Sequence, residues 1–179
     1  YGWEATFMPK PYVDRTGSGS HFNMSLSSSK TGKNISGDKR DTRGCGLSKI
    51  SYQFLGGIKR HAKAIVATTC PTVNSYKRLI KTGSMTGFTW APIFISYGGN
   101  NRTHMVRIPD EGRFELRLMD GAANPHLMQA GVLAAGLDGM NNKRDPGKRL
   151  DINMYTEGHK ARGAKKLPLN LLDAVRLTQ

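Results

Sequence analysis

Long hydrophobic runs and paired cysteines are both missing from this 179-residue sequence. No apolar stretch reaches the ~18 residues that a membrane-spanning helix needs, so no such helix is predicted. The two cysteines, Cys45 and Cys70, stand alone, which excludes a disulfide scaffold and a zinc site of CxxC pairs. A GxSxG motif and a paired Cys–His motif are also absent, so hydrolase chemistry is not supported. Unpaired cysteines favour a reducing compartment, and a cytoplasmic location is therefore predicted.

A leader peptide is lacking as well. Residues 1–12, YGWEATFMPKPY, contain neither the basic region nor the long apolar region of a secretory signal. The sequence begins without a methionine, and both of its ends fall in the middle of a sequence pattern. We therefore expect it to be a piece of a longer polypeptide. With 37% hydrophobic residues it still has enough apolar side chains for the core of one globular domain.

Acidic residues are few, because 13 Asp and Glu stand against 27 Lys and Arg, for a formal net charge of +14. Such a balance attracts polyanions, and a nucleic-acid-binding module is one interpretation of it. The basic residues are scattered, however, and no RNA-recognition signature or zinc knuckle occurs. Phosphorylated small molecules and carboxylates are anions too, so charge alone leaves both kinds of partner open.

The predicted elements indicate an α+β domain, because strands and helices do not alternate regularly. Asn124 before Pro125 is typical of a helix start, and the Ala- and Gly-rich sequence that follows permits close helix packing. Residues 81–92 are a glycine-containing loop and a candidate mobile lid. The hydrophobic patterns predict helices at 47–68, at 125–140 and from Leu169, and strands at 21–26, 93–98, 103–109 and 113–118.

Residues 113–118, RFELRL, alternate strictly between charged and apolar side chains. In a strand this pattern places Glu115 and two arginines on one face of a sheet and three apolar residues on the other. One interpretation is a sheet with one side in water. The other is a site in which two guanidiniums and a carboxylate handle anions and a metal ion.

His21 and Glu115 are the candidate metal ligands on these strands. An imidazole and a carboxylate on inward faces could hold Mg²⁺ or Mn²⁺, since carboxylates suit hard cations and histidine favours manganese. A lone histidine in a strand is more often a structural residue. Spacing by itself therefore leaves a metal site and a structural pair open.

Five arginines lie in or beside otherwise apolar segments. A guanidinium in a strand needs an anionic partner or water, and its planar fork suits carboxylates and phosphates. Because carboxylates are scarce, we expect several of these arginines to lack a protein partner and to clamp a substrate carboxylate and a transferring phosphoryl group. They are Arg78, Arg102, Arg107, Arg113 and Arg117.

Five motifs occur in the order found in glutamine synthetases, and the sequence resembles that family over nearly its whole length. They are GSGSHFNMSL, CPTVNSYKRLI, NNRTHMVRIP, RFELRLMDGAANPHL and AAGLDGM. The stretches ATFMPKP, TWAP and RLDINMYTEGH with LPLNLLDA look most like the bacterial type III subgroup. That subgroup is similar to the γ-glutamylmethylamide synthetases.

The resemblance implies a fold and a domain organisation. Residues 1–179 would be the C-terminal portion of an α+β catalytic domain, with an antiparallel sheet that forms part of an active-site barrel packed with helices. A small N-terminal β-grasp domain and the first half of the catalytic domain would lie upstream. The complete protein would be a homo-oligomeric ring with sites between subunits, so the segment is expected to be inactive alone.

The resemblance also implies an activity, that of an ATP-dependent ligase. It would form glutamine from L-glutamate and ammonia through a γ-glutamyl phosphate, with ATP as a substrate and Mg²⁺ or Mn²⁺ as the metal. The alternative is a γ-glutamylmethylamide synthetase, or another γ-glutamylamide synthetase, that uses an alkylamine. A basic nucleic-acid-binding module is a remote alternative, and otherwise no nucleic-acid or membrane partner is expected.

Motif positions carry the family's roles over to single residues of this sequence. His21 and Glu115 resemble the family's metal ligands, and Arg102 is also the expected catalytic arginine. The glutamate site is expected at Gly17, Arg78 and Arg117. The ATP site is expected at Asn23, Ser25, Arg102 and Arg107.

Three residues depart from the family's common pattern. Trp90 stands at about the place where ammonium-using members have a glutamate in the flap that binds and deprotonates ammonium. An aromatic group suits an alkylated amine better than bare ammonium, so Trp90 leaves the amine's identity open and is the expected selectivity residue. Thr16 replaces a frequent Asn and Asn23 a frequent His, and both are expected to adjust contacts.

Overall fold

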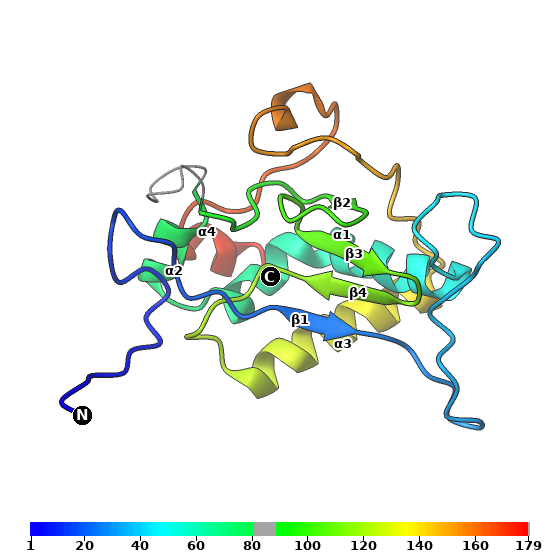
Figure 1. Ribbon diagram of the computed structural model, residues 1–179, viewed down its shortest axis with the longest axis horizontal. Coiled ribbons are helices and arrows are strands. Elements are labelled where there is room, and N and C mark those ends of the chain that lie inside the picture. The colour runs from blue at the N-terminus through cyan, green and yellow to red at the C-terminus, as the bar shows by residue number, and fades with distance from the viewer. Residues whose placement is uncertain (81–88, 179) are drawn as a thin grey trace.

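The computed structural model describes residues 1–80 and 89–178 (Figure 1). At its centre lies a four-stranded sheet in the order β1-β4-β3-β2. Its strands are β1 (Phe22–Met24), β2 (Tyr97–Gly98), β3 (Val106–Asp110) and β4 (Arg113–Leu116). The predicted mixture of helices and strands in an α+β arrangement is confirmed.

The sheet differs from the predicted one because it is open and mixed. β4 pairs antiparallel with β1 and β3, whereas β2 and β3 run parallel. After the loop between β2 and β3 the chain therefore runs in the same direction as before it. Asn101 Oδ1 holds this loop by accepting hydrogen bonds from the Thr103 amide at 2.9 Å and the Thr103 hydroxyl at 2.7 Å. The strand predicted at 93–98 shortens to Tyr97–Gly98, because Phe94 pairs instead with Lys166 of the C-terminal tail.

The two long helices begin at side-chain caps. α1 (Lys49–Thr69) starts two residues later than predicted, because the Ser48 hydroxyl accepts a hydrogen bond from the Ser51 amide and so ends the preceding loop. α3 (Pro125–Asn141) begins at the predicted Asn124–Pro125 pair, and the Asn124 side chain caps it.

Two short helices complete the described structure together with a 3₁₀ turn, η1 (Gly158–Lys160). α2 (Val73–Arg78) was not predicted, because a capped helix of only six residues is too short to show a periodic hydrophobic pattern. α4 (Leu171–Arg176) begins two residues after the predicted start, because Asn170 caps it. No helix within the described residues is long and apolar enough to cross a membrane.

α1 and α3 cross at a contact that only glycine allows. A Cβ at Gly57 would lie 1.9 Å from the carbonyl oxygen of Ala135, and a Cβ at Gly139 would lie 2.2 Å from that of Gln53. Both distances are far below any carbon–oxygen contact, so the backbones of the two helices touch. The close packing predicted from the Ala and Gly content of α3 is confirmed.

The helix pair covers the apolar face of the sheet. Phe114 and Leu116 of β4 are fully buried, as is Leu118 just beyond it. The ring of Phe114 lies 5.8 Å from that of Phe54 on α1, measured between centroids. Figure 1 shows both helices behind the sheet, which leaves its opposite face toward the viewer.

The opposite face carries the charged residues of RFELRL. The register places Glu115 of β4 directly opposite Asn23 of β1 and Arg107 of β3, so the three share one row. Glu115 is only 5% exposed and Arg117 only 3%. This face is therefore not the simple water-facing side of a sheet.

Candidate active site

Glu115 is the centre of a charged cluster on this face. Its Oε1 atom lies 2.8 Å from Nδ1 of His21 and accepts a hydrogen bond from Nη1 of Arg117 at 3.0 Å. Its Oε2 atom accepts a hydrogen bond from Nη1 of Arg107 at 2.8 Å. Segments at β1, β3 and β4 thus bring four of the predicted site residues together.

The surroundings keep Glu115 ionised and His21 neutral. Burial raises the pKa of Glu115, but the hydrogen bond from Arg107 and the charge of Arg117 outweigh it, and the pKa is lowered overall. Burial and the charge of Arg117 lower the pKa of His21, against the opposing effect of Glu115. One carboxylate therefore faces two guanidiniums, and the cluster carries a net positive charge that suits anionic substrates.

Arg78 extends the positive charge beside this cluster. It ends α2 and is 2% exposed, and its Nη1 and Nη2 atoms donate to the carbonyl oxygens of Leu118 at 3.0 Å and Arg117 at 3.4 Å. Both hydrogen bonds go to neutral backbone groups, and burial lowers the pKa of Arg78. A buried guanidinium held in this way is suited to pairing with a substrate carboxylate.

The glycine-rich segment lies directly over Arg78. A Cβ at Gly17 would lie 2.2 Å from the carbonyl oxygen of Pro9 and 3.2 Å from the Arg78 side chain. A Cβ at Gly19 would lie 3.1 Å from Nη2 of Arg78. Glycine is required at position 17, because any side chain there would overlap the Pro9 carbonyl oxygen. Gly17 and Arg78, both predicted for the glutamate site, thus lie close together.

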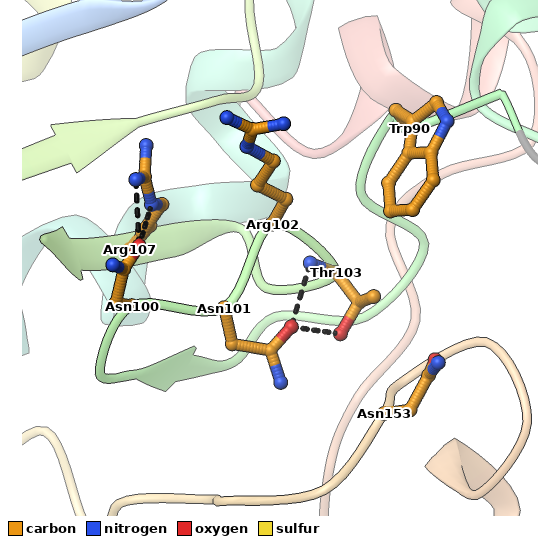
Figure 2. A pocket seen from close by; sticks show the side chains of 7 residues that line it. All are labelled: Trp90, Asn100, Asn101, Arg102, Thr103, Arg107 and Asn153. Atoms are coloured by element: carbon orange, nitrogen blue, oxygen red, sulfur yellow. Dashed lines mark hydrogen bonds between the residues drawn. The ribbon is translucent and has the colours of Figure 1, made fainter.

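A cavity of about 540 Å³ adjoins the cluster (Figure 2). Arg107 connects the two, because its Nη1 binds Glu115 while its Nε and Nη2 donate to Asn100 Oδ1 at 2.9 Å and 2.6 Å. Arg102 is exposed, and its guanidinium has no hydrogen bond or ion pair to the residues that the structure describes. The lining residues are Trp90, Asn100, Asn101, Arg102, Thr103, Arg107 and Asn153.

Asn23 and Ser25 are exposed, Asn23 on the edge strand β1 and Ser25 just beyond its end. Asn23 Oδ1 accepts a hydrogen bond from Nη1 of Arg113 at 3.0 Å, and Arg113 also pairs with Asp110. Neither Asn23 nor Ser25 lines the cavity of Figure 2. Asn23 and Ser25 therefore lie outside the cavity that is lined by Arg102 and Arg107, the two arginines predicted for the same role.

The expectation that several arginines lack protein partners is only partly right. Arg107 and Arg117 both pair with Glu115, and Arg113 pairs with Asp110. These pairs form because alternation along neighbouring strands puts the few carboxylates beside the guanidiniums, which composition alone does not reveal.

The donor chemistry of His21 and Glu115 suits a hard cation only in part. Within the described residues no group of three or more His, Cys, Asp or Glu side chains converges, so these two donors are an incomplete ligand set. Both oxygens of Glu115 also accept hydrogen bonds from arginines. A metal at this place would need further ligands and a shift of at least one guanidinium.

Trp90 lies in the last part of the predicted lid at residues 81–92. Gly83, Met85, Gly87 and Phe88, on which that expectation depends, lie outside the described residues. Trp90 is 41% exposed at the edge of the cavity, and its carbonyl oxygen accepts a hydrogen bond from Nη2 of Arg117 at 3.3 Å. The predicted selectivity residue thus lies beside the predicted glutamate residue.

Several cavity residues were not found by sequence reasoning. Asn100, Asn101 and Thr103 stand in a quoted motif but carry no charge that would single them out. Asn153, which lines the cavity, and the buried Tyr155, which lies behind Trp90, come from the tail between the predicted helices at 125–140 and from Leu169, where no element was predicted. The similarity of RLDINMYTEGH to one subgroup was the only available signal for this tail.

Together the buried carboxylate, the guanidiniums around it and the adjoining cavity define an α+β domain with a positively charged site on one face of its sheet. Residues 1–179 match the family described as glutamine synthetase, catalytic domain. The chain belongs to the glutamine synthetase family, which confirms the resemblance of its five motifs.

Two curated relatives and one solved structure illustrate the similarity. The chain is 53% identical over 176 residues to a glutamine synthetase of Rhizobium meliloti (strain 1021), covering 98% of this chain and 40% of that protein. It is 48% identical over 177 residues to a glutamate–methylamine ligase of Methyloversatilis universalis, covering 97% and 39%. A GmaS/ADP complex superposes with a TM-score of 0.86 at 53% identity, covering 97% and 39%. The chain thus spans about 40% of the length of these relatives.

Proposed function

We propose that this chain is the C-terminal part of the catalytic domain of an ATP-dependent ligase that forms glutamine from L-glutamate and ammonia. The observation that carries the proposal is the buried Glu115 carboxylate held between Arg107 and Arg117, beside the buried Arg78. Such a concentration of guanidiniums suits a reaction in which a carboxylate and a phosphoryl group must be brought together.

The chemistry has two steps. A γ-carboxylate oxygen of glutamate attacks the γ-phosphorus of ATP, the bond to the bridging oxygen breaks, and ADP leaves with γ-glutamyl phosphate formed. The amine nitrogen then attacks the acyl carbon, phosphate leaves with the bonding electrons, and the nitrogen loses a proton. Phosphoryl transfer needs positioning and charge stabilisation more than covalent help, and a cover over the acyl phosphate keeps water out.

The arginines divide between the two substrates. Arg78 and Arg117 would bind a glutamate carboxylate, with Gly17 allowing the backbone to approach it. Arg107 and Arg102, the latter without an ion pair among the described residues, face the cavity and would contact the phosphates, where Arg102 would stabilise the transferring group. Asn23 on β1 and Ser25 just beyond it would contact the nucleotide.

His21 and Glu115 would supply two ligands to Mg²⁺ or Mn²⁺, which would neutralise charge on the transferring phosphoryl group. The lowered pKa of His21 keeps its imidazole unprotonated, as a ligand must be. Further ligands would come from outside residues 1–179, so we infer that this segment is inactive alone. A homo-oligomeric ring and an upstream β-grasp domain belong to the same proposal.

A second candidate acceptor is methylamine, and Trp90 favours it. Its ring stands at the mouth of the cavity, where a carboxylate would be needed to deprotonate ammonium. An aromatic face contributes to binding an alkylammonium, and one methyl group gains only about 1–3 kcal/mol in a pocket. The similarity to a relative named glutamate–methylamine ligase, at 48% identity, supports this second candidate.

The test is a phosphate-release assay of the full-length enzyme with glutamate, ATP and either ammonium or methylamine. Wild type is expected to use both amines, and Trp90→Glu is expected to shift the ratio of kcat/KM toward ammonium by about tenfold, because a carboxylate restores an anionic partner for ammonium. Trp3→Glu is the matched control, since Trp3 is 92% exposed in the N-terminal segment.

Three results would contradict the proposal or parts of it. If wild type released no phosphate in response to either amine, the proposed ligase activity would be contradicted. A ratio unchanged by Trp90→Glu would show that another group selects the amine. A steep salt dependence of binding to random duplex DNA, with no ligase activity, would instead favour the nucleic-acid alternative.

A further inference from the structure

Residues 151–158 of the C-terminal tail are tied to the cavity wall at two points. Nδ2 of Asn101 donates to the carbonyl oxygen of Ile152 at 3.0 Å. The amide of Met154 donates to Oγ1 of Thr103 at 2.9 Å. The Asn101–Thr103 turn shown in Figure 2 therefore fixes the path of this tail beside the cavity.

The same tail places Tyr155 behind Trp90. Tyr155 is 3% exposed, and its hydroxyl donates to the carbonyl oxygen of Ala91 at 2.7 Å. Its ring meets the ring of Trp90 edge-on, with 6.1 Å between centroids and 75° between planes. Burial raises the pKa of Tyr155 to about 12, so the hydroxyl keeps its proton and stays a donor at neutral pH.

Trp90 needs such support because its backbone is strained. Its φ angle is +57°, in the left-handed region that a bulky residue rarely adopts. Two neighbouring carbonyl groups are held from outside, that of Trp90 by Arg117 and that of Ala91 by Tyr155. A strained conformation persists where the surrounding contacts over-determine it, as these do.

We propose that Tyr155 is a positioning residue that holds the Trp90 ring at the mouth of the cavity and so sets the preference among acceptor amines. This inference rests on the proposed ligase function and adds a specificity-determining residue to it. Tyr155 acts through Trp90, because its hydroxyl binds the next peptide group and its ring limits where the indole can turn. The amine would meet the indole, and Tyr155 would remain behind it.

The test is Tyr155→Phe in the full-length enzyme, which keeps the ring and removes the donor. The methylamine-to-ammonium ratio of kcat/KM is expected to fall by about threefold, the effect of one lost hydrogen bond. The change should come through the amine KM, with the KM for ATP unaltered. In a Trp90→Ala background the same substitution should leave the ratio unchanged, because no indole remains to be positioned.

Tyr97→Phe is the matched control. Tyr97 is also fully buried, and its hydroxyl donates to a backbone carbonyl, that of Gly147, at 2.8 Å. Removing this donor should cost similar stability and leave the amine ratio unchanged. If Tyr155→Phe lowers Tm as Tyr97→Phe does but leaves the ratio alone, Tyr155 is only structural and the proposal is overturned.

Amide hydrogen exchange separates this inference from the ligase proposal. Tyr155→Phe should speed exchange in a peptide spanning residues 89–96, and Tyr97→Phe should not. If wild type uses neither amine, the ligase proposal fails, while faster exchange still supports the positioning contact. Unchanged exchange overturns the contact whatever the activity.

Discussion

At the scale of single residues, Glu115 is where the charges of the site converge. Its carboxylate is nearly buried and accepts hydrogen bonds from Arg107 and Arg117. Replacing it would therefore leave these two guanidiniums without their negatively charged partner. A buried charge that loses its partner costs far more than an exposed one. This makes Glu115 the first residue to test.

Glu115→Gln should lower turnover of the full-length enzyme by about 100-fold or more, because the negative charge that orders the guanidiniums and would bind the metal is lost. The measurement is amine-dependent phosphate release at saturating metal. Glu111→Gln, in the exposed turn between β3 and β4, is the control and should leave turnover unchanged. Normal activity of Glu115→Gln would remove this residue from the site.

Arg117→Lys should raise the KM for glutamate by about tenfold while leaving the KM for ATP nearly constant. Lysine keeps the charge but loses the planar fork with which Arg117 reaches Glu115 and the Trp90 carbonyl together. Arg113→Lys at the start of β4 is the control, because Arg113 is exposed. An effect confined to ATP would assign Arg117 to the other substrate.

At the scale of elements, the contact between α1 and α3 supports the sheet from behind. The site residues lie on the opposite face, so their geometry depends on how closely these helices approach β4. Gly57 and Gly139 set that distance, because a side chain at either would meet backbone of the other helix.

Gly57→Ala should destabilise the protein by about 3 kcal/mol, because the added methyl would overlap the Ala135 carbonyl oxygen and force the helices apart. The measurement is Tm by thermal unfolding. Gly131→Ala on α3 is the control: its Cβ would lie 3.3 Å from Thr68 Oγ1, and we expect a change within about 1 kcal/mol. Equal effects of the two substitutions would show that the crossing does not limit stability.

At the scale of the whole molecule, the buried His104 links stability to pH. Burial lowers its pKa to about 4, and its Nδ1 lies 3.0 Å from the Ser96 hydroxyl. As the pH falls from 6.5 toward 4, the unfolded chain takes up a proton at His104 that the folded chain does not. Stability is therefore fully present above pH 6.5 and decreases below it.

As the pH falls from 7 to 5, the titration of His104 should lower the free energy of unfolding by about 2 kcal/mol. His104→Gln removes the titrating group, so its Tm should fall less than that of wild type over the same interval. Thermal unfolding at both pH values measures the difference. Parallel decreases in the two proteins would mean that other groups cause the acid sensitivity.

Local signals in the sequence determined much of this structure. The Asn124–Pro125 start of α3 was predictable because a cap and a fixed φ angle act within one helical turn. The alternation of RFELRL was predictable because a strand sends neighbouring side chains to opposite faces. The five motifs indicated the family, because their residues and their order can be read from the sequence without knowledge of the fold.

Tertiary structure alone decided what surrounds these elements. His21 and Arg117 stand 96 residues apart, and Tyr155 and Ala91 stand 64 apart, yet both pairs are in contact. The parallel pairing of β2 and the burial of the charged face likewise depend on where distant segments return. Periodicity describes one element at a time, whereas these contacts follow from the path of the whole chain, so only the folded molecule shows that Glu115 lies among arginines and that Tyr155 supports Trp90.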